Sequence, residues 1–518
     1  MSLSVAAPPA VAAPLRSRWW VLGALVAGLL VMGLDITVLN VALPTLATSL
    51  DASTSQLQWI VDAYVLVLAG AILPLGALAD RWGRRRLLLG GLGTFAAGSL
   101  VAAFATSVAT LIAARAFMGL GAAVISGVTL AVLPVLFGPA ERRKAIAYVT
   151  MALGAGVPLG PIVGGWLLDH YWWGSVFVVN VPVAVAAAVA VAVLLPESRD
   201  PHPAGADPLG GLLSTSGLVA VVYGVVEAPL RGWTDGLVVA ALAAGLVLLG
   251  GFVAWERRWR SPMIDLGLFR RPRFLWGTAA TTVVSFALFG LLFVLPQYFQ
   301  AVRGHDPLGT GLRLLPMMGG LIVGAKTGET LAARAGTRLP VATGLFLVAA
   351  ALAGGAATGT GTPYGWIAAW TALVGAGTGL AMAPAMDAVL GELPPERAGS
   401  GSALSMTLRQ VGGALGVAVL GSIASTVYGH RLDAVLDGAG LPAAAASTAS
   451  RSVSGAVEVA ARLGDAGLAA AGRSAYADAM AAVLLFCAAV AVVGGLLTAA
   501  LLPARGGSDA ASGDRIEA

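Results

Sequence analysis

Long runs of apolar residues, separated by short polar turns, follow one another along nearly the whole chain. A helix that crosses a bilayer needs about 20 consecutive, mostly apolar residues. Counting runs of that length predicts about fourteen membrane-spanning helices. They fall near residues 19–44, 57–78, 87–106, 109–133, 146–167, 175–195, 209–227, 237–255, 274–299, 308–328, 339–358, 364–390, 400–426 and 476–502.

The composition of the 518 residues agrees with this pattern, because 58% are hydrophobic and only 11% are charged. A soluble globular protein carries about 25% charged residues. We therefore expect an all-α polytopic membrane protein. The single cysteine, Cys487, lies in the last apolar run, so no disulfide framework and no cysteine metal site is expected.

Basic residues gather in alternate turns between the predicted helices, which is the positive-inside pattern. With the N-terminus inside, the inner turns hold most of the basic residues: Arg81, Arg84, Arg85, Arg86, Arg142, Arg143, Lys144, Arg199, Arg257, Arg258, Arg260, Arg270, Arg271, Arg273, Arg334, Arg338 and Arg397. The short outer turns hold only Arg231 and Arg303. This asymmetry predicts an even number of spans with both termini cytoplasmic. It also explains the net charge of +5 as a topology signal, so the charge does not indicate nucleic-acid binding.

The domain organisation follows from the same runs. The two halves echo each other: GALADRWGRRRLLL (76–89) follows the second predicted helix, and ETLAARAGTRLPV (329–341) follows the tenth. If the seventh and eighth helices are an insertion, the other twelve form two six-helix bundles, as in many secondary transporters. We expect bundles at 19–196 and 274–502, two extra helices with linkers at 197–273, a cytoplasmic tail at 1–18 and a disordered tail at 503–518.

One predicted outer segment, about 427–475, is much longer than the other turns. Long loops escape the charge rule, so its arginines do not change the topology. The segment is rich in Ala, Ser and Gly and contains stretches able to form helical pieces. It is interpreted as a solvated linker, with an extracellular cap as the alternative.

Asp35 lies deep inside the first apolar run. Inserting a carboxylate at mid-membrane depth costs at least about 2.5 kcal/mol on insertion scales. A carboxylate at this depth therefore indicates a functional role. Asp35 is therefore a candidate proton- or cation-handling residue. The alternatives are a position near the membrane interface or a structural ion pair.

The turn GALADRWGRRR (76–86) combines features that topology alone does not need. Its arginines suffice to set the orientation, whereas Gly76, Asp80 and Gly83 add sharp bending and a fixed acid. We interpret it as a gating turn that latches the two halves, through Gly76, Asp80, Arg81, Gly83, Arg84 and Arg85. This Gly, Asp, Arg, Gly, Arg-rich turn after the second helix resembles the signature of the major facilitator superfamily.

Arg115 lies within another apolar run, LIAARAFMGLGAA (111–123). An intramembrane arginine needs a partner, and Asp35 is the obvious candidate. A nearby arginine favours the charged form of an acid, whereas burial favours the neutral form, so their balance suits a site that loads and unloads a proton. The rival interpretation is a permanent structural pair. In the family resembled, this fourth-helix arginine is associated with proton coupling.

The fifth predicted helix carries GAGVPLGPIVGG (154–165). Gly156, Gly160 and Gly164 recur every four residues and therefore share one helix face that permits close packing, while two prolines bend the helix. Alone, this is a kinked packing face. With its neighbours it resembles the antiporter motif of the family's exporters, made here by Gly154, Gly156, Pro158, Gly160, Pro161, Gly164 and Gly165.

The stretches LDITVLNVALP (34–44) and LQWIVDAYVLVLAGAILPLGALADRWGRRR (57–86), with the two extra helices, narrow the resemblance. Together they look like the fourteen-helix drug:proton antiporter branch, which includes quaternary-ammonium and dye exporters. The resemblance covers nearly the whole chain. It implies the major facilitator fold: two six-helix bundles plus two extra central helices, fourteen in all.

Asp62 is a second acid within a predicted helix, close in sequence to Trp59 and Tyr64. Carboxylates in an apolar, aromatic cavity suit lipophilic cations, so Asp35, Asp62, Trp59 and Tyr64 are candidate substrate-binding residues. The alternative places Asp62 near the outer surface, facing water. The chain also departs from the dication exporters it resembles: Ser405, Met406 and Gln410 stand where those exporters carry acids, and Arg409 is the charged group. Monovalent, neutral or anionic substrates therefore stay open.

The resulting hypothesis is a proton-coupled exporter of small lipophilic compounds in a bacterial plasma membrane, working by alternating access. No phosphate-binding loop, metal cluster or nucleophile triad stands out, so we expect no cofactor and no enzyme activity, with the proton gradient as energy source. The expected partners are the substrate, protons and the bilayer, with a monomer as the functional unit and no nucleic acid. An importer or uniporter of a polar metabolite on the same fold is the first alternative, and a membrane enzyme or receptor the second.

Overall fold

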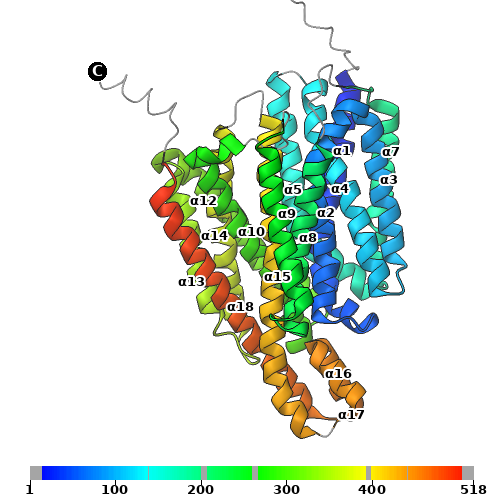
Figure 1. Cartoon of the computed structure of the whole chain (residues 1–518), viewed down its shortest axis with the longest axis vertical. Helices are drawn as coiled ribbons and strands as arrows, with labels where there is room; N and C mark the ends of the chain where they lie inside the picture. Colours follow the sequence, from blue (N-terminus) through cyan, green and yellow to red (C-terminus); the bar gives the residue numbers. More distant parts are fainter. Residues whose placement is uncertain are drawn as a thin grey trace, which may run out of the picture.

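The computed structural model describes residues 15–137, 139–199, 207–259, 266–392, 398–439 and 441–504, and within these ranges the secondary structure is helical, with no strand. Figure 1 shows the long helices running side by side. We call the end where α1 begins and α18 ends the basic end, and the end formed by α16 and α17 the loop end.

Seven helices form the first bundle. They are α1 (Leu15–Ser49), α2 (Thr54–Trp82), α3 (Arg84–Ala103), α4 (Val108–Leu136), α5 (Pro139–His170), the short α6 (Ser175–Val178) and α7 (Asn180–Leu194). Within the bundle α1 packs against α5, α2 against α4, and α3 against both α4 and α7. Several begin at a side-chain cap: Ser53 and Gln56 form a capping box at α2, and Ser107 caps α4.

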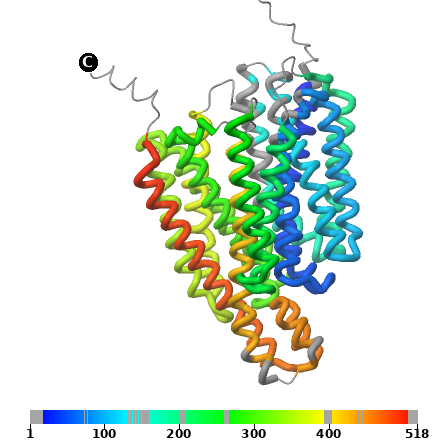
Figure 2. The backbone as a smooth tube through the Cα atoms, in the orientation of Figure 1, coloured from blue at the N-terminus to red at the C-terminus, as the bar shows by residue number. Residues whose placement is uncertain are grey.

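The second bundle follows two extra helices. Its elements are η1 (Leu266–Arg270), α10 (Pro272–Gln297), η2 (Tyr298–Val302), α11 (Pro307–Arg313), α12 (Leu315–Ala335), α13 (Arg338–Gly355), α14 (Tyr364–Gly391), α15 (Ala398–Ala439) and α18 (Ala466–Leu501). The extra helices α8 (Pro208–Arg231) and α9 (Gly236–Glu256) form a hairpin whose α8 packs against α2 of the first bundle and α15 of the second. In Figure 2 the blue helices lie on one side of the molecule and the light-green and red helices on the other.

Thirteen spans in the described residues are long and apolar enough to cross a membrane. They match the predicted runs, with α6 and α7 together forming one span and α11 and α12 another. The remaining predicted helix, 146–167, lies within the 32-residue α5. Many side chains of α5 are outside the described set, so this span is not among the thirteen.

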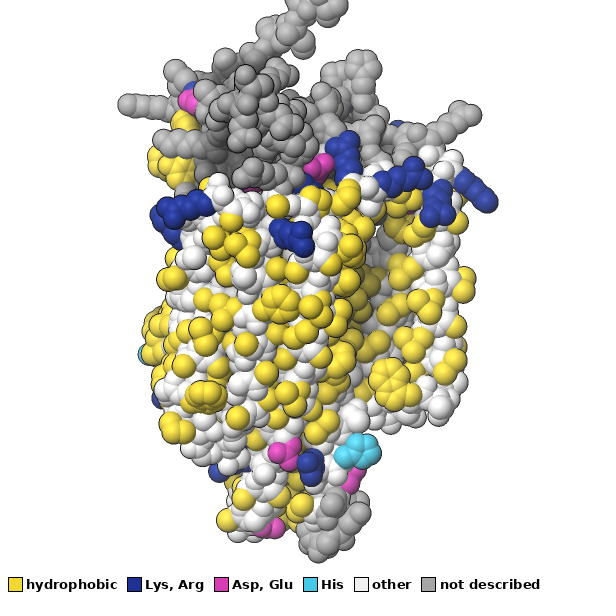
Figure 3. Space-filling view, turned by 90° about the vertical axis from the view of Figure 1, so that its left-hand side faces the viewer, with side chains coloured by type: hydrophobic (Ala, Val, Ile, Leu, Met, Phe, Trp, Pro, Cys, Tyr) yellow, Lys and Arg dark blue, Asp and Glu magenta, His cyan; other side chains and the backbone are white. Residues whose placement is uncertain are grey.

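Apolar side chains cover the middle of the molecule. Figure 3 shows hydrophobic side chains spread over one face, with Lys and Arg gathered along the edge near the basic end. Leu246 and Val247 of α9 are 67% and 72% exposed. Only 17% of the most apolar 18-residue stretch of α9 is buried by protein. Exposing such an apolar surface to water is energetically unfavourable, whereas contact with lipid tails is not. This band therefore faces the bilayer.

The interpretation of 427–475 as a solvated linker is wrong. In its described residues α15 continues to Ala439, α18 begins already at Ala466, and α16 (Ala443–Arg451) and α17 (Val453–Leu463) lie between them. The predicted helical pieces are confirmed. Val453, Ala456, Val459 and Ala460 of α17 are at most 5% exposed, because that face of the amphipathic helix packs against α18 and α1.

Candidate functional site

Asp35 and Arg115 form an ion pair inside the first bundle. Nη1 of Arg115 donates to Oδ2 of Asp35 at 2.5 Å, and the side chains of Arg115 and Asp35 are only 1% and 2% exposed. Asp35 lies in the middle of α1 and Arg115 in the first third of α4, so the pair is far from either end of the bundle. The pairing expected from the sequence is therefore present, and the interface position is not.

The other contacts of Arg115 and Asp35 are also made with groups of the protein. Nε of Arg115 donates to the carbonyl of Ile60 at 3.2 Å, and its guanidinium carbon lies 4.3 Å from the ring centre of Tyr64. Nδ2 of Asn180, at the start of α7, donates to Oδ1 of Asp35 at 2.9 Å. Each oxygen of the carboxylate thus has a donor, which is the condition under which a buried carboxylate is tolerated.

Asp62 has no such support. It is 0% exposed, and neither of its oxygens has a hydrogen-bond partner among the described residues. It lies one turn from Gln58 on α2, and Gln58 contacts α15 of the second bundle. The alternative in which Asp62 faces water is therefore wrong, because Asp62 is buried close to the junction of the two bundles.

The aromatic residues near Asp62 lie in different surroundings. The ring of Tyr64 covers Arg115 and is fully buried, and its hydroxyl has no partner in the described part of the chain. Trp59 is half-buried, and its ring centre lies 6.1 Å from that of Tyr223 on the extra helix α8. The structure thus groups Tyr64 with the Asp35–Arg115 pair and Trp59 with α8.

The glycines of α5 bring it against α1. A Cβ on Gly156 would lie 2.7 Å from Cα of Gly33, and one on Gly160 would lie 2.9 Å from Cβ of Thr37. The hydroxyl of Thr37, two residues from Asp35, donates to the carbonyl of Gly156 at 3.4 Å. The predicted packing face is confirmed, and it lies directly against the segment of α1 that carries Asp35. Of Gly154 and Pro158 only the helical backbone is described.

The other side of this motif contacts the second bundle. A Cβ on Gly165 would lie 2.6 Å from Cα of Leu308, and one on Gly311 would lie 2.2 Å from the carbonyl oxygen of Pro161. Leu308 and Gly311 belong to α11, so the end of α5 nearest the loop end joins the bundles backbone to backbone.

Burial and the nearby Arg313 and Arg303 lower the pKa of His305, which lies just before α11.

Polar contacts close the loop end further. Nε2 of Gln58 donates to the carbonyls of Val417 and Ala418 on α15 at 3.1 and 2.8 Å. Nε2 of Gln300 donates to the carbonyl of Val41 on α1 at 2.8 Å. Arg451 of α16 pairs with Asp51 at 2.9 Å, so the α16–α17 segment also reaches the first bundle.

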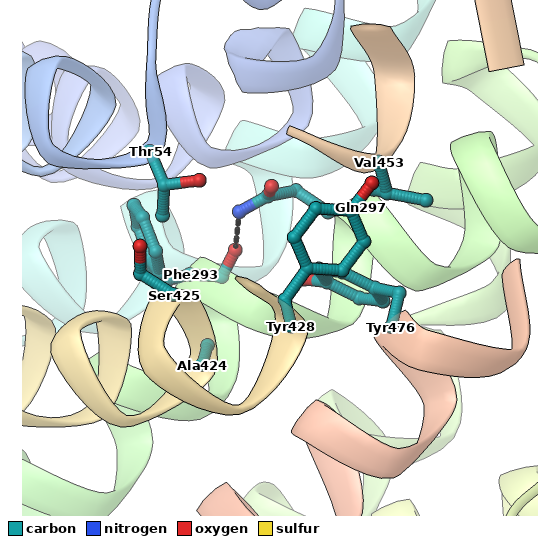
Figure 4. Close-up of a pocket in the computed structure, with 8 residues that line it drawn as sticks. All are labelled: Thr54, Phe293, Gln297, Ala424, Ser425, Tyr428, Val453 and Tyr476. Atoms are coloured by element: carbon teal, nitrogen blue, oxygen red, sulfur yellow. Dashed lines mark hydrogen bonds between the residues drawn. The ribbon is translucent and has the colours of Figure 1, made fainter. Parts of the chain in front are cut away.

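A small cavity marks the closed loop end (Figure 4). It is lined by Thr54, Phe293, Gln297, Ala424, Ser425, Tyr428, Val453 and Tyr476, from five different helices. Its volume of about 10 Å³ holds about one water molecule, whereas a pocket for a drug-sized ligand has several hundred Å³. The bundles therefore leave no drug-sized opening here.

The turn between α2 and α3 is built on Gly83. Its φ of 111° is a conformation that only glycine adopts easily, and the carboxylate of Glu197 packs directly on it. Glu197 accepts the backbone N–H of Arg85 at 3.2 Å and lies 3.6 Å from Nε of Arg86. The turn is thus tied to the segment that follows α7.

The other residues of the predicted gating turn have different outcomes. Gly76 is half-buried, and a Cβ there would meet nothing within 4 Å, so packing does not require glycine. Arg81 is exposed at the end of α2. The side chain of Asp80 lies outside the described residues, so its predicted latch with Arg84 remains a prediction.

The second bundle contributes one unusual charge near the basic end. Arg409 lies in α15, is half-buried and makes no hydrogen bond or ion pair within the described part of the chain. Ser405 and Gln410 beside it are 0% and 4% exposed. The described residues contain no group of three or more His, Cys, Asp or Glu placed to hold a metal ion.

Sequence reasoning missed two residues of these sites. Asn180 completes the shell of Asp35 and Glu197 organises the Gly83 turn. Asn180 did give a signal, since it is the one amide in the apolar stretch FVVNVPVAVAAAVAV. Glu197 gave none, because a glutamate in a polar turn is unremarkable.

Comparisons with known proteins agree with this architecture. The chain is 34% identical over 420 residues to the tetracenomycin C resistance and export protein of Streptomyces glaucescens, covering 81% of this chain and 78% of that protein. It is 35% identical over 506 residues to the multidrug efflux pump LfrA of Mycolicibacterium smegmatis, covering 95% and 99%.

A solved structure shares the fold at low identity. A bacterial homologue of the human lysosomal transporter Spinster, in an inward-facing and unoccupied conformation, superposes with a TM-score of 0.66 at 17% identity, covering 95% of this chain and 99% of that one. The pattern that defines the Major Facilitator Superfamily matches residues 25–417, which is most of the chain. With its two helix bundles, its Gly83 turn and its α5 glycine motif, the chain belongs to the Major Facilitator Superfamily.

Proposed function

We propose that the protein exports small lipophilic compounds in exchange for protons, with the Asp35–Arg115 pair as the proton site. The observation that carries the proposal is the carboxylate of Asp35, buried at mid-depth and held by Arg115 and Asn180. An intramembrane acid is costly and marks a functional site by default. The names of the relatives, a resistance and export protein and a multidrug efflux pump, support efflux as the direction.

The proposed orientation places the basic end in the cytoplasm. The arginine-rich turns at that end follow the positive-inside rule, and α1 begins and α18 ends there. The closed loop end is then extracellular, and the state described is closed on that side. The protein is then a multi-pass protein of a bacterial plasma membrane, and we expect a monomer to be sufficient because each chain contains both bundles.

In the proposed cycle, the cytoplasmic end and the extracellular end of the protein open in turn. Asp35 is deprotonated when the compound binds from the cytoplasm or the inner leaflet, and a proton from outside then favours release. Arg115 stabilises the carboxylate, and the glycine face of α5 lets the helix move along α1. Each ligand can shift the two states only by its difference in affinity for them. Asp62 and Tyr64 are proposed to contact the compound when the bundles separate, and Trp59 to line the side next to α8.

The test uses purified protein in liposomes with an imposed pH gradient and a fluorescent lipophilic cation as probe. Wild-type protein should drive gradient-dependent transport, and Asp35→Asn should abolish it. The matched control is Asp387→Asn, which removes an exposed carboxylate of α14 and should leave transport unchanged.

Each outcome separates one hypothesis from another. Transport that ignores the gradient would refute the coupling. Gradient-driven transport that survives Asp35→Asn would move the proton site elsewhere, with Asp62 next. Accumulation in the direction opposite to efflux would indicate an importer.

A further inference from the structure

A groove lies at the basic end that the proposed transport cycle does not use. It has a volume of about 360 Å³ and is lined by Arg81 and Trp82 at the end of α2, Arg86 and Leu87 at the start of α3, and Arg199 beyond α7. It is therefore formed by three segments of the first bundle that meet beside the Gly83 turn.

The groove carries positive charge that the described residues do not neutralise. The carboxylate of Glu197 is engaged by the backbone N–H groups of Arg85 and Ser198 and lies 3.6 Å from Nε of Arg86. Arg81 and Arg199 are exposed and have no hydrogen bond or ion pair within the described ranges. The side chain of Asp80 and residues 200–206 lie outside those ranges.

An exposed aromatic ring lies beside these guanidinium groups. Trp82 is 63% exposed, although burial of an indole ring is strongly favourable in water, and Leu87 supplies further apolar surface. Tryptophan at the end of a spanning helix is typical of the headgroup region, where its ring faces lipid and its N–H faces water. The groove thus presents guanidinium groups and apolar surface to the same ligand.

We infer that this groove binds an anionic phospholipid of the cytoplasmic leaflet. Arg81 and Arg199 would hold the phosphodiester by paired N–H donors, and Trp82 with Leu87 would contact the glycerol and the first carbons of the acyl chains. Free inorganic phosphate shares the anion chemistry but leaves the apolar side unused. The inference rests on the proposed orientation of the basic end, not on the direction or substrate of transport.

The experiment measures lipid binding to the purified full-length protein in neutral detergent micelles. Phosphatidylglycerol and phosphatidylcholine, each with a doxyl group near the headgroup end of one acyl chain, are titrated while tryptophan fluorescence is followed. The difference between wild type and Trp82→Phe isolates the signal of Trp82. We expect phosphatidylglycerol to quench that signal at a lower concentration than phosphatidylcholine does.

Substitutions then assign the contacts. Arg81→Gln and Arg199→Gln should each weaken phosphatidylglycerol binding about fivefold, since a basic residue near an anionic lipid contributes about that factor. The matched control is Arg257→Gln with Arg258→Gln, which removes two exposed arginines of the basic end outside the groove. Native mass spectrometry of lipid-bound protein provides a second readout that needs no fluorescence.

The inference is overturned if both lipids quench Trp82 equally and mass spectrometry shows no preferential retention of phosphatidylglycerol. It is also overturned if the control pair weakens binding as much as Arg81→Gln or Arg199→Gln does. Displacement of the lipid by millimolar inorganic phosphate would reduce the site to a simple anion site. These binding readouts involve no transport, so failure of the proposed function and failure of the lipid site are distinguishable.

Discussion

At the scale of single residues, the amide of Asn180 is the group through which the first bundle adjusts the Asp35 site. It donates to Oδ1 of Asp35, while Arg115 occupies Oδ2. A hydrogen bond to a charged group contributes about 1.5–3 kcal/mol, and in a buried site the partner left behind is not rescued by bulk water. Asn180 therefore stabilises the ionised form of the proposed proton site.

We predict that Asn180→Ala lowers gradient-driven efflux about tenfold or more. Losing the donor leaves Oδ1 of the buried carboxylate without a hydrogen-bond partner, which destabilises the ion pair of the proposed proton site. Initial efflux rates in liposomes with an imposed pH gradient measure the effect.

Ser99→Ala is the control for this prediction. Ser99 accepts a longer hydrogen bond of 3.4 Å from the same amide, whereas the two oxygens of Asp35 are held by Asn180 and Arg115, so removal of the Ser99 hydroxyl should lower efflux much less. Unchanged efflux in Asn180→Ala would show that the amide only fills space.

Physical reasons explain which of these residues could be predicted from the sequence. Asp35 and Arg115 interrupt long apolar runs, so the cost of burying each charge alone predicts that the two side chains pair. The burial of Asp62 was not decidable, because its depth depends on how α2 meets α15 and not on α2 itself. Asn180 stands out as the one amide in an apolar stretch, but its partner Asp35 is 145 residues away. Glu197 contacts a turn 112 residues away, and no local spacing in a single sequence encodes such contacts.

At the scale of elements, the glycine face of α5 is where close packing is required. The added Cβ of Gly156 would meet backbone atoms of Gly33, and backbone cannot rotate away as a side chain can. By contrast, a Cβ at the exposed Gly93 of α3 would meet nothing within 4 Å. The same chemical change therefore has opposite expected effects at two helical positions.

Gly156→Ala should lower the thermal unfolding temperature of the purified protein and its transport rate, because overpacking costs about 1–3 kcal/mol. Gly93→Ala should leave transport unchanged and stabilise the protein slightly, since alanine in a helix is favoured over glycine by about 0.5–1 kcal/mol. Fluorescence-detected unfolding in detergent compares the two. Equal behaviour of the two variants would refute the close contact between α1 and α5.

Helix positions were predictable because the bilayer fixes their length. The predicted bounds of α3, α8, α9 and α13 agree with the structure within a few residues. The prediction was wrong where helices leave the apolar layer: α15 and α18 extend well beyond the runs 400–426 and 476–502. There the helix is stabilised by contacts such as the hydroxyl of Tyr428 donating to the carbonyls of Ala449 and Ser452, which no apolar run reports.

At the scale of the whole molecule, the loop end is held shut by contacts that cross between bundles. Alternating access requires these contacts to break and re-form in every cycle. The α2–α15 contact is suited to a test, because a Cβ on Gly421 would lie 2.9 Å from Cγ of Gln58. Two cysteines there are within the reach of a disulfide, whose Cβ atoms lie about 3.5–4.5 Å apart.

We predict that Gln58→Cys with Gly421→Cys, in a Cys487→Ala background, loses transport when oxidised and regains it when reduced. The disulfide would hold α2 of the first bundle to α15 of the second and keep the loop end closed. Val283→Cys with Gly494→Cys is the matched control, because the two Cβ positions are 3.6 Å apart but both residues belong to the second bundle, on α10 and α18. Oxidation of that pair should leave transport intact. Full transport by the oxidised α2–α15 pair, with the disulfide verified by mass spectrometry, would mean that the bundles do not separate here, and that export proceeds without opening the loop end between α2 and α15.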